Sequence, residues 1–198
     1  MVDELSSRKH ALRRALTAIV IVALGYLVLV NALLNIGLTQ DVVNAIRPEK
    51  FRVSWDSAWS AIPFRVHARG IQASGQSRSQ QWQVNADAAS GSIRLLPLIL
   101  KRVYLSDVEA FNVEYRQRPR LKQDRDYSER LRYFPEIAGW DVQPADTSPR
   151  KKKRPWKIYL RDAYASGDIK LWIYNLQASG TGSAVADLSV ETRGGPFT

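Results

Sequence analysis

The chain contains no cysteine among its 198 residues, and it has only two histidines. The absence of cysteine excludes disulfide bonds, thiolate catalysis and cysteine-ligated metal ions. His10 lies in the basic N-terminal segment, and His67 stands between Arg65 and Arg69. Neither histidine has the neutral, carboxylate-rich surroundings that a metal ion needs. We therefore expect no metal ion and no cofactor.

Catalytic motifs are missing as well. The chain has no G-x-S-x-G turn and no glycine-rich loop followed by Lys-Ser/Thr. A serine-hydrolase triad would have to use His67, and the aspartates are scattered without the paired spacing that general acid–base chemistry uses. The sequence therefore predicts a protein that is not an enzyme, and no catalytic residue is nominated.

Charged residues are absent from residues 15–38, and this stretch is apolar. About 20 apolar residues suffice to cross a hydrocarbon core of about 30 Å, and in lipid such a segment must be helical. The run is longer than the apolar part of a signal peptide, and no clear cleavage site follows it. We expect an uncleaved transmembrane helix. Its Asn31 and Asn35 either bond a partner helix or lie at the far membrane interface.

The charges that flank the apolar run are asymmetric. Four basic residues precede it and a single acidic residue follows it closely: Arg8, Lys9, Arg13 and Arg14, then Asp41. Basic residues stay on the cytoplasmic side of a membrane. Residues 1–14 are therefore predicted to be cytoplasmic. In a bacterium the bulk of the chain would be periplasmic and anchored to the inner membrane.

Residues 39–50 form a link after the span. Val42, Val43 and Ile46 share one side of a helix that Pro48 would end. We expect a short amphipathic helix that sets the following domain on the membrane surface.

From residue 51 the apolar period changes to two, which indicates β-strands. Residues 51–116 read as strands with one apolar face in an antiparallel meander. Before Gly70 the apolar residues of this segment stand at even positions, and after it they stand at odd positions, which predicts a bulge or bend. The fold class is therefore mainly β with one N-terminal transmembrane helix.

Residues 117–155 interrupt the strands with several prolines and the basic run RKKKR at 150–154, and read as an exposed loop. The net charge of +10 favours an anionic partner. An outside location denies the run access to nucleic acid, so it is either a contact for anionic phospholipid headgroups or a solvated loop. Strands resume over residues 156–198 and stop within a strand pattern. We expect either a short chain or the front of a longer one.

Four segments carry a resemblance to a known family. They are FRVSW at 51–55, the P-V-A-G-I-A pattern at 63–73, the apolar piece LLPLILKR at 95–102 and the V-L-V-E-F-V pattern at 103–113. Together with the N-terminal anchor, they resemble the AsmA-like family of inner-membrane-anchored lipid transfer proteins. The resemblance covers residues 10–116 well and 156–190 loosely, and it does not cover the loop at 117–155.

The resemblance implies a chorein-like sheet curled into a groove, whose apolar inside shields acyl chains during phospholipid transport and outer-membrane biogenesis. Eight side chains would line that groove: Phe64, Val66, Ile71, Val84, Val103, Leu105, Phe111 and Val113. Five would contact anionic headgroups: Arg150, Lys151, Lys152, Lys153 and Arg154. Its partners would be phospholipids, the membrane and other envelope proteins.

A rival interpretation belongs to another class. The chain could be a single-pass scaffold or assembly protein whose β-domain has a closed, dry core and binds another protein. Copurified phospholipid on the exported domain would distinguish the groove from this alternative.

Overall fold

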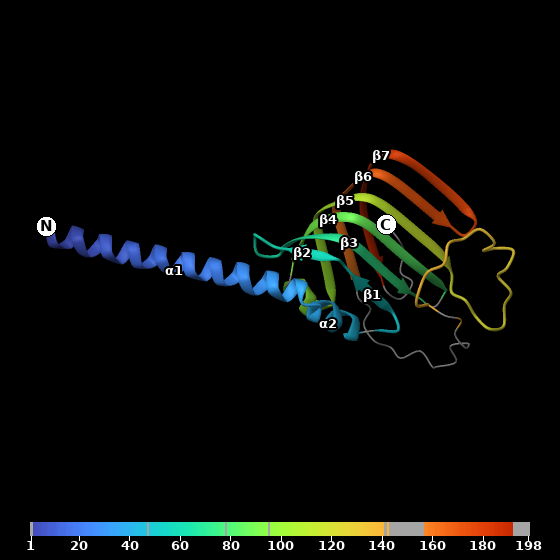
Figure 1. Cartoon of the computed structure of the whole chain (residues 1–198), viewed down its shortest axis with the longest axis horizontal. Coiled ribbons are helices and arrows are strands. Elements are labelled where there is room, and N and C mark those ends of the chain that lie inside the picture. Colours follow the sequence, from blue (N-terminus) through green and yellow to red (C-terminus); the bar gives the residue numbers. More distant parts are fainter. Residues whose placement is uncertain are drawn as a thin grey trace.

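A computed structural model describes residues 2–46, 48–77, 79–94, 96–140, 142 and 157–191. In these residues a long N-terminal helix leads into one curved β-sheet (Figure 1). Residues 51–116 and 157–191 contribute strands to the same sheet, so the two predicted β-segments are parts of one structure.

The first helix, α1 (Val2–Asn35), contains the predicted membrane segment. Its part Leu12–Asn35, 24 residues, is long and apolar enough to cross a membrane. α1 ends at Asn35, before the predicted end of the span at Leu38. Gly37 adopts a left-handed conformation (φ 76°), which ends α1, and the second helix α2 (Leu38–Ile46) begins at Leu38.

In the described part of the chain the sheet has seven strands. Six follow the order β1-β3-β4-β5-β6-β7, and β2 pairs with β3 on the same side as β1, at a different part of that strand. Between β4 and β5 lies a short 3-10 helix, η1 (Leu96–Leu100). The strands are β1 (Phe51–Ser54), β2 (Ser57–Trp59), β3 (Arg65–Gln76), β4 (Gln80–Arg94), β5 (Arg102–Pro119), β6 (Lys157–Ile173) and β7 (Leu176–Glu191). This confirms the mainly β fold class.

The expectation of a wholly antiparallel meander is wrong at one position. β5 and β6 pair in parallel, from Arg102 opposite Lys157 to Gln117 opposite Ile173. Parallel neighbours require a connection long enough to return along the sheet, and residues 120–156 separate β5 from β6 in the sequence. A loop without periodicity does not reveal the direction in which the chain returns, so the sequence pattern gave no sign of the parallel pairing.

The two ends of the sheet differ. The anchor end holds the strand ends at Arg65, Arg94, Arg102 and Lys157, and the far end holds those at Gln76, Gln80, Pro119 and Ile173. At the anchor end, pairing gathers an anchor-end patch of Val66, Ala68, Ala89, Ile93, Val103, Leu105, Ile158 and Leu160. At the far end, it gathers a far-end patch of Ile71, Ala73, Val84, Ala86, Val113, Tyr115, Ile169 and Leu171.

The two apolar patches lie on opposite faces of the sheet. β4 pairs with β3 in one register throughout, so its side chains alternate between the faces. Val84 of the far-end patch and Ile93 of the anchor-end patch are an odd number of residues apart, which places them on opposite sides. The alternation of apolar residues therefore reverses its parity along β4 without a bulge in that strand.

A loop covers the polar face of the far end. Residues 120–140 pack there, and their Ile137 and Trp140 are buried. Arg118 on β5, also buried, donates hydrogen bonds to Gln81 Oε1 (2.9 Å) and to the carbonyl oxygen of Trp140 (3.1 Å). The guanidinium of Arg52 lies over the Trp140 ring, 4.9 Å from its centre. The largest buried side chains thus lie on the face opposite the far-end patch.

Residues with left-handed backbone mark the middle of the long strands. They are Gly70 in β3, Asp107 and Asn112 in β5, and Asp162 and Gly167 in β6. Side chains bond across the strands near these positions, since Asn112 Nδ2 donates to Asp87 Oδ2 (2.7 Å) and Thr181 Oγ1 to Asp168 Oδ1 (2.7 Å). Glycine, asparagine and aspartate tolerate this conformation best. The irregularity predicted at Gly70 is thus present as a local change of backbone, without a register shift.

Replacing Gly70 by alanine should destabilise the domain by about 1–3 kcal/mol. The backbone there has φ 61°, and an added Cβ would overlap the Asp56 carboxylate. Gly180 is the matched control, because a Cβ at that position meets no atom within 4 Å. Urea unfolding of both variants checks this expectation, and equal midpoints for Gly70→Ala and Gly180→Ala would contradict it.

Candidate membrane and lipid interface

Asparagine side chains of α1 bond the backbone of the sheet edge. Asn31 donates through Nδ2 to the carbonyl oxygen of Ser60 (3.0 Å) and accepts from the Ser60 N–H (2.8 Å). Asn35 does the same with Ala58, at 2.6 and 3.1 Å. Each side-chain amide thus occupies the place of a neighbouring strand.

The contact continues along α2. Asn44 accepts from the N–H of Val53 (2.8 Å) and donates to its carbonyl oxygen (2.9 Å), and Gln40 donates to the carbonyl oxygen of Trp55 (2.8 Å). We call Asn31, Asn35, Gln40 and Asn44 the amide ladder. An unpaired edge strand is open to pairing with other chains, and the amide ladder blocks that edge. Asn31 and Asn35 therefore have partners within their own chain, and the recurring amides were the signal in the sequence.

The ladder places the first edge of the sheet beside the apolar helix. Tyr26 and Asn31 lie within Leu12–Asn35, and the Tyr26 hydroxyl is 2.9 Å from Ser60 Oγ. About 13 Å of helix separate Tyr26 from Asn35, at a rise of about 1.5 Å per residue. The turn after β2 accordingly reaches back along α1 (Figure 1). α2 is consequently bound to the sheet edge through its polar side chains.

The eight predicted lining residues do not share one face. Val66, Val103 and Leu105 belong to the anchor-end patch. Ile71, Val84 and Val113 belong to the far-end patch, and Phe111 pairs with Ala88 on that same face. Phe64 lies in the turn before β3, with φ 68° and an exposed ring. The sequence pattern identified apolar residues correctly but could not assign them to the two sides.

The predicted headgroup contacts, Arg150, Lys151, Lys152, Lys153 and Arg154, lie outside the described residues. Other basic residues stand at the anchor end. They are Arg65, Arg94, Lys101 and Arg102, placed at the ends of β3, β4 and β5. These positions suit contacts with anionic headgroups at a membrane surface.

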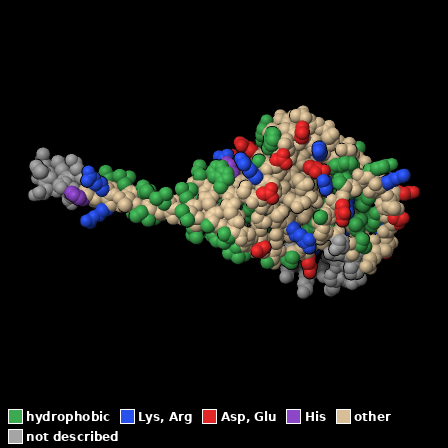
Figure 2. Space-filling view, viewed as in Figure 1, with side chains coloured by type: hydrophobic (Ala, Val, Ile, Leu, Met, Phe, Trp, Pro, Cys, Tyr) green, Lys and Arg blue, Asp and Glu red, His purple; other side chains and the backbone are tan. Residues whose placement is uncertain are grey.

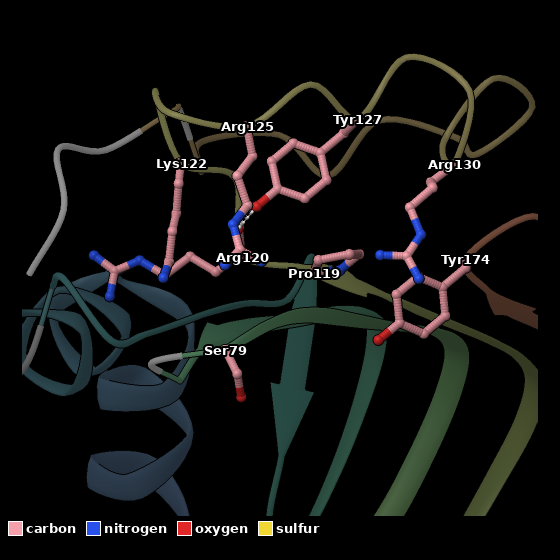
Figure 3. A pocket seen from close by; sticks show the side chains of 8 residues that line it. All are labelled: Ser79, Pro119, Arg120, Lys122, Arg125, Tyr127, Arg130 and Tyr174. Atoms are coloured by element: carbon pink, nitrogen blue, oxygen red, sulfur yellow. Dashed lines mark hydrogen bonds between the residues drawn. The ribbon is translucent and has the colours of Figure 1, made fainter.

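A second feature with many charges lies at the far end. A cavity of about 250 Å³ is lined by four cationic side chains and two phenols, with no acidic residue (Figure 3). Its lining is Ser79, Pro119, Arg120, Lys122, Arg125, Tyr127, Arg130 and Tyr174. The Tyr127 hydroxyl donates to the carbonyl oxygen of Arg120 (3.1 Å). Such a cavity can hold a small anion, and the density of Arg and Lys after residue 115 was its sequence signal.

Burial affects two polar groups near this end. Burial raises the pKa of the Tyr115 phenol, whose hydroxyl donates to Gln117 Oε1 (2.7 Å). Burial also lowers the pKa of Arg118, and the nearby Glu136 carboxylate opposes that shift. Tyr115 is therefore a neutral phenol at ordinary pH and adds to the apolar character of the far-end patch.

No cluster of three or more His, Asp or Glu side chains suited to a metal ion occurs among the described residues. No protein-family model, curated protein or solved structure matches the chain. The resemblance to AsmA-like proteins thus stays a prediction, and function has to be argued from the geometry.

Proposed function

We propose that this protein is a membrane-anchored lipid-binding protein, in which acyl chains leave the bilayer along the anchor-end patch. One observation carries the proposal. The anchor-end patch begins at the same end of the sheet that the amide ladder and Tyr26 hold beside the apolar helix. An acyl chain in the adjacent leaflet would therefore meet an apolar β-surface directly.

Among the helices and strands that the structure describes, none packs over the anchor-end patch, whereas an apolar sheet face is normally covered by a second layer. The principal contacts of β4 and β6 with other elements are with their neighbours in the sheet, and η1 contacts β5. Helices α1 and α2 contact β2 and β1 at the edge instead. Acyl chains can supply the missing cover, at about 0.8 kcal/mol for each buried CH₂ group.

The setting of this activity follows from the charges around α1. With residues 1–14 in the cytoplasm, the sheet lies in the periplasm, anchored to the inner membrane. Phospholipid transport toward the outer membrane, with other envelope proteins as partners, is the role that this arrangement supports. Basic residues at the anchor end, such as Arg94 and Arg102, would keep a lipid phosphate at the membrane surface while its chains follow the sheet.

Site-specific photo-crosslinking in living cells tests the proposal. A photoreactive residue at Ile93 should form phospholipid adducts that mass spectrometry identifies. The same residue at Ser92 is the matched control, because the two neighbours point to opposite faces of β4. Equal lipid labelling at both positions, or protein adducts alone at Ile93, would refute lipid binding on this patch.

A scaffold function is the second candidate, and one observation favours it. Among the described residues β7 pairs with β6 alone, and its Leu176 and Val185 are exposed. Such an edge can accept a strand from another protein. Protein adducts from a photoreactive residue at Val185, together with no lipid adducts at Ile93, would support this function instead.

A further inference from the structure

We propose that the anchor end of the sheet is inserted into the hydrocarbon of the bilayer as an apolar wedge, and does not merely rest on the membrane surface. The wedge consists of the β2–β3 turn (residues 61–64) and η1 (Leu96–Leu100). This inference rests on the membrane anchoring in the proposed function, and it deepens that function by stating where the sheet meets the lipid.

The depth at which the wedge begins is set by Ser60. Ser60 bonds Asn31, and its hydroxyl lies 2.9 Å from that of Tyr26. Both Asn31 and Tyr26 belong to the apolar segment Leu12–Asn35. About 20 residues span the hydrocarbon, so a span that starts at Ala15 ends near Leu34. Tyr26 is then about 12 Å below the hydrocarbon boundary, at about 1.5 Å per residue. The residues that follow Ser60 consequently start below the membrane surface.

The backbone of β2 at that depth is hydrogen-bonded to α1. Non-helical backbone is tolerated in hydrocarbon only where its polar groups are bonded within the protein. Ala58 and Ser60 are 3% and 1% exposed, and both have their N–H and carbonyl groups bonded to asparagines of α1. The Ser60 hydroxyl also donates to the carbonyl oxygen of Ile62 (3.0 Å). At Ala58 and Ser60 the outward-facing backbone groups of β2 therefore need no water.

The wedge exposes large apolar side chains next to this edge. Five large apolar side chains of the wedge are exposed: Ile62 (61%), Phe64 (57%), Leu96 (83%), Ile99 (81%) and Leu100 (52%). The two segments are adjacent, because the N–H of Ile93 donates to the carbonyl oxygen of Phe64 (2.9 Å) just before η1. Apolar side chains gather where the helix enters the domain (Figure 2). Exposed apolar groups of this extent mark a binding surface.

The sequence around the wedge favours the bilayer as its partner. Neither segment of the wedge contains a charged residue, and basic residues follow or precede each segment: Arg65 after the turn, Arg94 before η1, and Lys101 and Arg102 after it. Long basic side chains extend from apolar surroundings to headgroups, and they commonly flank inserted segments. The β2–β3 turn also starts beside α1, whose apolar surface is itself exposed. Lipid therefore fits this surface better than a protein partner.

The absence of cysteine makes the test direct. The full chain, with one introduced cysteine carrying the environment-sensitive fluorophore NBD, would be reconstituted as a single copy in phospholipid nanodiscs. Ile99→Cys and Ile62→Cys report on the wedge. Leu176→Cys, 65% exposed at the far end, is the matched control. The two wedge probes should show blue-shifted emission, several-fold stronger quenching by doxyl-labelled acyl chains than the control, and little quenching by iodide.

Iodide quenching of the Ile99 and Ile62 probes equal to that of the Leu176 probe would overturn the wedge. A second copy or another protein cannot cause the protection, because each nanodisc holds one chain and lipid only. Lipid adducts at Ile93 with water-exposed wedge probes would refute the wedge and leave the lipid-binding function standing. Buried wedge probes without lipid adducts at Ile93 would refute the function and leave the wedge standing.

Discussion

Replacing Asn31 and Asn35 together by leucine should detach the sheet edge from α1 and lower the free energy of unfolding by at least about 4 kcal/mol, about 1 kcal/mol or more for each of four backbone groups. The two side chains satisfy both backbone groups of Ser60 and of Ala58. A buried backbone group that loses its partner costs about 1–3 kcal/mol, and water cannot easily replace the asparagines because Ala58 and Ser60 are almost fully buried. β2 then has no hydrogen-bonded neighbour on the side that faces α1.

Hydrogen exchange of the full chain in nanodiscs measures this effect at the amides of Ala58 and Ser60. Both amides should exchange much faster in the double variant. Ala32→Leu is the control, because Ala32 is exposed and the change adds a similar apolar volume to the same helix. Unchanged protection of both amides in the double variant would show that the amide ladder does not hold the edge.

The leucine substitutions also separate anchoring from docking. Leucine is more favourable than asparagine in a membrane span, so the double variant should remain fully in the membrane fraction. A fall in edge protection with intact membrane insertion is therefore the expected combination. Loss of the protein from the membrane fraction would instead mean that the asparagines support insertion itself.

The second large effect is expected for Arg118→Met, which should destabilise the far end by about 3–5 kcal/mol. Arg118 is buried, and it joins β4 to the covering loop through Gln81 and the carbonyl oxygen of Trp140. Methionine fills much of the volume but leaves these oxygen atoms buried without a donor. The loop at 120–140 should then separate from the sheet.

Limited proteolysis of the folded protein measures loop release, and urea unfolding measures the stability change. Arg130→Met is the matched control, because Arg130 is exposed on the same loop. An exposed substitution of this kind usually changes stability by less than about 0.5 kcal/mol. If both variants resist protease equally, the Arg118 hydrogen bonds do not hold the loop in place.

Some features of this fold depend on neighbouring residues, and others depend on residues far apart in the sequence. The apolar run, the end of α2 at Ile46 and the change of backbone at Gly70 could be read from the sequence, since each depends on neighbouring residues. The end of α1 at Asn35 was missed because apolar character continues through Gly37 to Leu38. Composition does not reveal a left-handed glycine.

The candidate site was predictable only in part. Apolar residues such as Val84 and Leu105 were predicted to line one groove, but the face on which each lies depends on the register between strands. The exposed residues of η1 were visible as an apolar piece, whereas their position next to the β2–β3 turn follows from the bond between the Ile93 N–H and the carbonyl oxygen of Phe64. The cationic cavity joins residues from three separate turns and loops, which no short motif records.

The sequence by itself determined that this protein has one apolar helix long enough for a membrane, followed by long β-strands. Both conclusions rest on short-range periodicity and on the need of a backbone in lipid to bond itself. The tertiary structure alone decided that Asn31 and Asn35 hold a sheet edge, that β5 and β6 are parallel, and that the apolar patches face opposite ways. These features arise from contacts between distant residues, and a local pattern does not encode the partner of a hydrogen bond.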